Sequence, residues 1–174
     1  MFSPPSLQRD YTLCSEHDDA LDLPVVPVLA DEAPPEDVEH AKKLAEDRAL
    51  KLKIARDKGE WSTLIKPGRT PARFHFRQLP RSSVHWWLGE IERHEWTHVE
   101  SLELLFRLAC KGIDCTGIKA QFETDGGGRE LLSVDTLDSL YRLNGDDGTG
   151  PRIVVELGSI VADKVTTRGV RPLS

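Results

Sequence analysis

The first 33 residues of this chain lack the periodic apolar pattern of a hydrophobic core, so the folded domain is expected in the residues that follow. They show no helical or strand periodicity, and they contain Pro4, Pro5, Pro24 and Pro27. Proline fixes φ and removes an amide donor, so such a stretch favours extended or polyproline conformations. The same segment carries seven acidic groups and one base, whereas the rest carries 22 of each, so the net charge of −6 lies here. We therefore predict that residues 1–33 form an extended acidic arm.

The arm contains an apolar strip, LDLPVVPVL, at residues 21–29. The strip is too rich in proline for a central strand, but an extended segment of this kind can place side chains in a groove on another chain. One alternative is a solvated, disordered tail. The interpretation we adopt is a partner-binding arm that is ordered only in an assembly, so that its deletion leaves the fold intact. Its predicted binding residues are Leu23, Val25, Val26, Val28 and Leu29.

Residues 34–58 predict a long charged helix that opens at the two prolines 34 and 35 and ends before Gly59. Acidic residues lie in its first turn and basic residues toward its end, an order that complements the helix dipole. Its apolar positions form a narrow stripe, which indicates a semi-exposed helix that packs one face on the body or on a neighbour. A coiled coil is less favoured, because the alanines are small and no heptad is sustained.

Residues 59–165 predict an α+β domain, and two helices between residues 82 and 112 are expected to form the centre of its core. Alternation over residues 73–77 indicates a strand with Phe74 and Phe76 on one face. A helix capped by Ser82 or Ser83 is predicted to run to about residue 93. A second helix begins at the capping box of Thr97 and ends at Gly112.

The second half of the domain predicts a β-hairpin, a short helix and a longer helix. The hairpin spans residues 118–134 and turns at the glycines 126–128, and the short helix is capped by Asp135. A loop at residues 144–150 precedes a helix that opens at Pro151, although the β-branched run at 153–157 leaves a strand open there. Residues 166–174 are a tail. The predicted fold class is α+β, a mainly helical single domain with a small antiparallel hairpin or sheet, preceded by the long helix and the arm.

The most specific motif is HEWTH at residues 94–98, which matches the H-E-x-x-H pattern of zincin metalloproteases. That mechanism needs both histidines on one face of an unbroken helix and a third ligand. Here Thr97 is better placed to cap a new helix. No clear second motif supplies the third ligand, since Glu123 and Glu130 lie in or near the predicted hairpin. We therefore predict a break between the histidines, and a zinc metalloprotease is the least favoured function.

Other chemistry finds little support in the sequence. The glycine run at 126–128 lacks the residues of a phosphate loop, and residues 144–148 lack the spacing of a calcium-binding EF-hand. Cys14, Cys110 and Cys115 follow no disulfide or zinc spacing, which suits a reducing compartment. No catalytic residue, metal ligand or cofactor is predicted. The acidic balance argues against a general nucleic-acid binder, and no direct sequence-specific contact with nucleic acid is predicted. No apolar run approaches the roughly 18 residues of a membrane span or forms a secretory signal, so no membrane partner is predicted.

The chain has four tryptophans although only 6% of its residues are aromatic. Trp86 and Trp87 are adjacent on a predicted helix, so their side chains project about 100° apart and one is expected at an edge. Tryptophan is enriched at binding hot spots. We therefore add three residues to the predicted partner-binding set: Trp86, Trp87 and Trp96.

Five sequence segments carry a resemblance to a known class of proteins. They are RFHFRQLP at 73–80, VESLELLF at 99–106, KGI at 111–113, LDSLY at 137–141 and IVVELG at 153–158. Over residues 59–162 their order resembles small morphogenesis proteins of tailed bacteriophages, of the tail-assembly-chaperone or minor-virion type. The resemblance implies a non-enzymatic structural or assembly protein that binds other phage structural proteins or copies of itself, in the virion or in the host cytoplasm during assembly. The alternatives are a transient tail-assembly chaperone and a host-binding adaptor.

Overall fold

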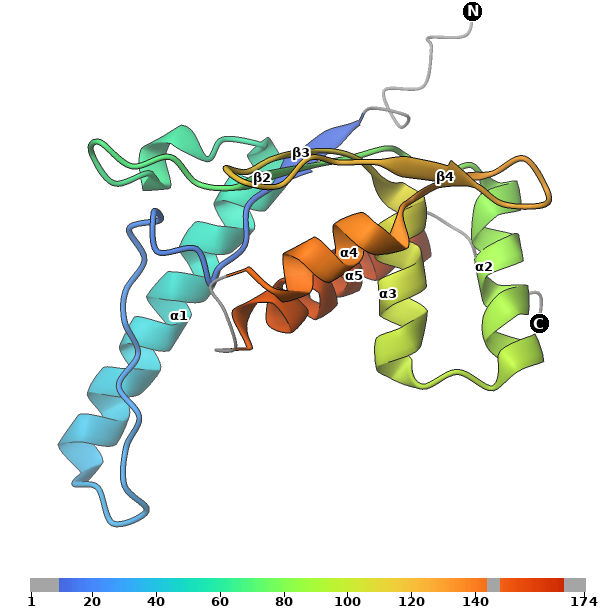
Figure 1. Ribbon diagram of the computed structural model, residues 1–174. Helices are drawn as coiled ribbons and strands as arrows, with labels where there is room; N and C mark the ends of the chain where they lie inside the picture. The colour runs from blue at the N-terminus through green and yellow to red at the C-terminus, as the bar shows by residue number, and fades with distance from the viewer. Residues whose placement is uncertain (1–9, 144–147, 168–174) are drawn as a thin grey trace, which may run out of the picture. The chain divides into compact units, whose positions relative to one another are not determined.

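The computed structural model describes residues 10–143 and 148–167 (Figure 1). The chain divides into two compact units. The larger unit contains residues 10–17, 72–143 and 148–167, and the smaller unit contains residues 18–71. The described residues form five α-helices, a three-stranded sheet and a two-stranded sheet, which confirms the predicted, mainly helical α+β class.

The three-stranded sheet of the larger unit is antiparallel and has β2 at its centre. It consists of β1 (Tyr11–Leu13), β2 (Arg73–Phe76) and β3 (Cys110–Asp114), in the order β1-β2-β3. Phe74 and Phe76 are fully buried on one face of β2, as the alternation predicts. The ring nitrogens of His75 lie 2.8 Å from Thr12 Oγ1 and 2.8 Å from Asp114 Oδ2, so this side chain joins all three strands.

Strand β1 corrects the prediction that all of residues 1–33 lie outside the domain. Tyr11–Leu13 pairs with β2, the Tyr11 ring stacks on Phe76 at 5.6 Å, and Leu13 and Cys14 are buried. A three-residue strand is too short to show a period in the sequence, and its partner lies more than 60 residues further along the chain. Deletion of residues 1–33 would therefore remove an edge strand and part of the core, contrary to our expectation.

Helices α2 (Arg81–His94) and α3 (His98–Ala109) occupy the predicted region, with corrected ends. The predicted cap of α3 is confirmed, because the Thr97 hydroxyl accepts a hydrogen bond from the Glu100 amide at 3.3 Å. The predicted end of α3 at Gly112 is wrong, because the chain leaves the helix at Cys110 to pair with β2 as strand β3. Helix α2 begins directly after Pro80 and not at a serine cap.

The predicted hairpin is present as β4 (Phe122–Thr124) and β5 (Glu130–Leu132). Its turn is held by Asp125, whose Oδ1 accepts hydrogen bonds from the amides of Gly127 and Arg129. Helix α4 (Val134–Tyr141) is capped by Ser133 and not by Asp135, which lies inside its first turn.

Helix α5 (Thr149–Thr167) begins two residues before Pro151, and the strand alternative for residues 153–157 is wrong. The predicted loop lies largely outside the described residues, since residues 144–147 are not described, and so does the tail from residue 168.

In the core of the larger unit, helix α3 packs against the three-stranded sheet on one side and against α5 on another. The Phe106 ring of α3 meets Phe74 and Phe76 edge-on, with ring centroids 6.1 and 5.5 Å apart. Helices α3 and α5 approach closely at Gly158, where a Cβ atom would lie 2.8 Å from the Leu102 carbonyl oxygen. The other large, fully buried side chains are Leu13, Leu105, Leu132, Leu140, Leu157, Val84, Val154 and Val161.

The smaller unit is built on α1 (Pro35–Lys58), which starts and ends where the sequence predicts. Pro34 precedes its first turn, and Gly59 closes it in the left-handed conformation with φ of 65°. Three side chains of α1 are buried, Ala41, Leu52 and Ala55, which confirms a single narrow packing face.

An extended segment, residues 18–33, completes the smaller unit and runs beside α1 (Figure 1). The Arg48 guanidinium donates to the Pro24 carbonyl at 3.1 Å. The Asp22 amide donates to the Leu64 carbonyl of the short helix η2 (Ser62–Leu64) at 2.6 Å. These contacts place the second half of the predicted arm inside a folded unit, contrary to the expectation that it is ordered only in an assembly.

The close approach at Gly158 yields a stability prediction. Gly158→Ala adds a methyl group against backbone atoms of α3, so we expect the free energy of unfolding to fall by about 1–3 kcal/mol in urea denaturation. The matched control is Gly89→Ala, at another helical glycine, where an added Cβ would have no neighbouring atom within 4 Å. Because alanine favours helix, the control should keep or raise stability, by up to about 1 kcal/mol. Equal effects of the two substitutions would contradict the close packing of α3 on α5.

Candidate functional site

The exposed apolar side chains of this protein are concentrated in the smaller unit. Among the described residues, nine large hydrophobic side chains are exposed, and five of these nine belong to residues 18–71. We call these five the exposed apolar set: Val25, Val28, Val38, Leu50 and Ile54. Single exposed apolar residues are ordinary, so the evidence rests on the members that are neighbours along the chain or the helix: Val25 with Val28, and Leu50 with Ile54.

Val25 and Val28 are the most exposed members, at 82% and 101% of their reference surface. They come from the predicted partner-binding strip, and their exposure leaves them free to contact another chain. Val26 and Leu29 of the same strip are half-buried. Leu23 is buried, so its prediction as a binding residue is wrong: its side chain belongs to the interior.

Leu50 and Ile54 lie one turn apart on α1, and the helical period places them opposite the buried Leu52 and Ala55. Ion pairs border them on the helix. Lys51 lies 3.3 Å from Asp47, and Lys53 lies 2.9 Å from Asp57. This face of α1 therefore combines two apolar side chains with charges of both signs.

The three predicted tryptophans have different environments. Trp87 is buried, and its indole Nε1 donates to the Ser101 carbonyl at 2.8 Å, so it is a core residue that ties α2 to α3. Its prediction as a partner-binding residue is wrong for that reason. Trp86 is half-buried, with the Arg129 guanidinium 4.8 Å from its ring. Trp96 is half-buried and stacks on His94, so Trp86 and Trp96 stay predictions.

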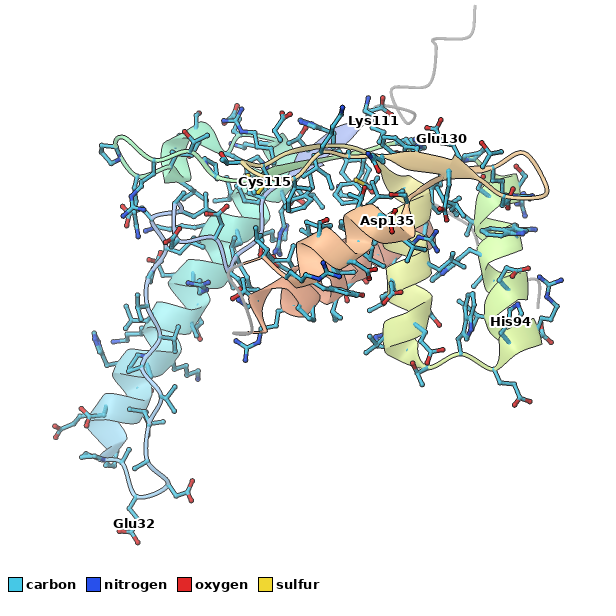
Figure 2. The ribbon with its side chains drawn as sticks, viewed as in Figure 1. Glu32, His94, Lys111, Cys115, Glu130 and Asp135 are labelled. Carbon is cyan, nitrogen blue, oxygen red and sulfur yellow. The ribbon has the colours of Figure 1, made fainter. Side chains whose placement is uncertain are left out.

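The HEWTH motif straddles a helix boundary. Helix α2 ends at His94, Glu95 adopts the left-handed conformation with φ of 53°, and Thr97 caps α3. The predicted break is confirmed, and His94, labelled in Figure 2, lies at the end of α2 with its Nε2 3.2 Å from Glu90 Oε2. Zincin catalysis requires two histidines one turn apart on a common helix. His94 and His98 lie on two different helices, so they do not have this arrangement.

Cys110 is not an activated nucleophile. Cys14 and Cys110 are buried, and Cys115 is half-buried. Burial raises the pKa of the Cys110 thiol to about 12, so the reactive thiolate is scarce at neutral pH. Burial and the neighbouring Glu103 carboxylate also raise the pKa of Tyr141 above its usual range.

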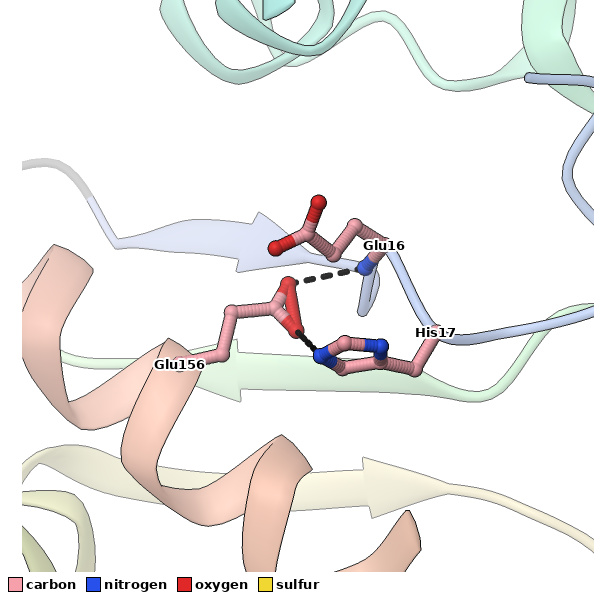
Figure 3. A group of neighbouring side chains, drawn as sticks. All are labelled: Glu16, His17 and Glu156. Carbon is pink, nitrogen blue, oxygen red and sulfur yellow. Dashed lines mark hydrogen bonds and ion pairs between the residues drawn. The ribbon is translucent and has the colours of Figure 1, made fainter. Parts of the chain in front are cut away.

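One group of side chains in the described part of the chain has the composition of a metal site: Glu16, His17 and Glu156 (Figure 3). The three offer ligand atoms that all lie within 4.8 Å of one another. The sequence does not predict this group, because Glu156 lies about 140 residues after the other two and no motif links them. The only signal in the sequence is the adjacent pair of glutamate and histidine.

Comparisons with models of protein families, with curated proteins and with solved structures found no match to this chain. In the part of the chain that the structure describes, no helix is both long enough and apolar enough to cross a bilayer.

The left-handed conformation of Glu95, between the two histidines, predicts that a glycine there stabilises the protein. Glu95→Gly removes the Cβ that disfavours this conformation, so we expect the free energy of unfolding to rise by about 0.5–1 kcal/mol. The control, Glu92→Gly, lies in the exposed last turn of α2, where the backbone is still helical, and should lower it by up to about 1 kcal/mol. If chemical denaturation shows that both substitutions destabilise the protein alike, residues 94–98 form one continuous helix and the break is refuted.

Proposed function

We propose that this chain is a non-enzymatic structural or assembly protein of a bacteriophage particle, and that it binds neighbouring subunits through the exposed apolar set. The observation that carries the proposal is the concentration of exposed apolar side chains in residues 18–71, above all Val25 and Val28. The phage assignment rests on the resemblance of residues 59–162, and the mode of binding rests on the smaller unit.

The segment around Val25 and Val28 is well suited to binding. Pro24 and Pro27 restrict the backbone to extended conformations, and the Arg48 and Leu64 contacts hold the segment on its unit. A segment that is already ordered loses less conformational entropy when it binds. Burial of a valine side chain then contributes about 1.5 kcal/mol or more, at about 25 cal/mol per Å² of apolar surface.

Helix α1 offers a second binding element. Its first turn contains the acidic residues Glu36 and Asp37, and its last turn contains the basic residues Arg56 and Lys58. A partner that lies along α1 therefore meets opposite charges at the two ends, with Leu50 and Ile54 between them. Such charge complementarity favours one orientation of the partner, whether a different phage protein or a second copy of this chain.

The most direct test combines particle analysis with a paired substitution. We expect quantitative mass spectrometry of purified particles to find the wild-type chain at a fixed stoichiometry. Val25→Asp with Val28→Asp places two charges on the proposed surface, and we expect its incorporation to fall at least tenfold while circular dichroism stays unchanged.

The matched control is Leu88→Asp with Val134→Asp, two exposed apolar residues of the larger unit. This double variant should be incorporated as the wild type is. Absence of the chain from particles would refute a permanent structural role and favour a transient chaperone or a host-binding adaptor. Equal incorporation of both double variants would refute the binding surface.

A further inference from the structure

Three side chains from two distant segments meet in the larger unit, just after β1 and in the first half of α5 (Figure 3). Glu16 and His17 follow β1 closely, and Glu156 projects from the second turn of α5. The Glu156 carboxylate lies 3.9 Å from His17 Nε2, and the Glu16 carboxylate faces the same space. Two carboxylates and one imidazole are thus brought to a common centre.

The Glu156 carboxylate is in an environment that disfavours its negative charge. Its side chain is only 9% exposed, and burial together with the nearby Glu16 carboxylate raises its pKa above the usual range. The other two ligand groups are both carboxylates, and His17 is the one member of the group that is not acidic. A divalent cation placed among the three groups would neutralise both carboxylates and offset the cost of burying Glu156.

Neighbouring groups fix the orientation of the Glu156 carboxylate. The buried Ser15 hydroxyl donates to Oε2 at 2.7 Å, and the Glu16 amide donates to Oε1 at 2.8 Å. A carboxylate oxygen carries two lone pairs, so one that accepts a hydrogen bond can also coordinate a cation. Hydrogen bonds of this kind, which hold a ligand in place from behind, are typical of protein metal sites.

The ligand set indicates the class of metal. An imidazole nitrogen with carboxylate oxygens suits Zn²⁺ and neighbouring transition metals, whereas Mg²⁺ and Ca²⁺ favour oxygen ligands alone. Tetrahedral ligands at 2.0–2.2 Å from zinc lie roughly 3.4 Å apart. In the structure the three ligand atoms lie within 4.8 Å of one another, so zinc binding would draw them closer together by about 1.4 Å at most.

We propose that Glu16, His17 and Glu156 form a binding site for one divalent transition-metal ion of the Zn²⁺ class, which clamps the end of β1 to α5. Three protein ligands leave one position for water or for a ligand from another molecule. Because the ion needs both segments in place, its binding stabilises the folded larger unit. This site is independent of the phage assignment and of the HEWTH motif.

The test is calorimetric titration of the full-length, chelator-treated protein with ZnCl₂, followed by thermal unfolding with and without the metal. We expect one ion per chain and a higher unfolding midpoint with zinc. His17→Ala removes a ligand on an exposed side chain, and we expect at least a tenfold loss of affinity and loss of the zinc-dependent shift. Glu16→Gln, which keeps the shape of the side chain, should weaken binding in the same direction.

The matched control is His98→Ala, which removes an exposed histidine of the HEWTH motif and should leave zinc binding unchanged. Zinc binding that survives His17→Ala and Glu16→Gln, or that is lost in His98→Ala, would overturn the proposed site. A wild-type protein that shows no saturable zinc binding would overturn it as well.

Discussion

The larger unit depends on the contact of Phe74 and Phe76 with Phe106. These three rings join the central strand β2 to α3, and α3 in turn packs closely on α5 at Gly158. The same aromatic layer extends to Tyr11, which brings β1 into the sheet. Because β1 leads into Glu16 and His17, the packing of the sheet also sets where these two side chains meet α5. Core packing and the proposed metal site therefore share one structural origin.

Local chemistry explains the parts of the fold that the sequence predicts well. Gly59 ends α1, Thr97 starts α3, and the alternation around Phe74 marks β2, because a few neighbouring residues determine each of these features. Strands β1 and β3 escape such prediction, since each is stabilised by pairing with β2 and not by its own pattern.

The candidate binding residues divide in the same way. The exposure of Val25 and Val28 agrees with the extended strip that the neighbouring prolines predict, whereas the burial of Leu23 depends on the folded unit. The burial of Trp87 and the approach of Glu156 to His17 are likewise tertiary contacts, which no local sequence pattern predicts.

The histidine motif shows why spacing alone does not define a site. Five letters match a zinc-binding helix, yet Glu95 turns the backbone into the left-handed region and Thr97 begins another helix. The polar residues that do converge, Glu16, His17 and Glu156, carry no recognisable spacing. The members of the exposed apolar set are ordinary valine, leucine and isoleucine residues, and only their solvent exposure in the fold distinguishes them. The proposed binding surface and the proposed metal site therefore rest on tertiary placement and not on a motif.

The measurement that tests the account most directly is cross-linking mass spectrometry on purified phage particles with an amine-reactive reagent. Helix α1 carries exposed lysines on several faces, Lys42, Lys43, Lys51 and Lys53 among them. If the smaller unit binds neighbouring subunits, these lysines should form cross-links to other chains more often than Lys111 and Lys119 of the larger unit, which are also exposed. Intermolecular cross-links confined to the larger unit, with none from α1, would contradict the account.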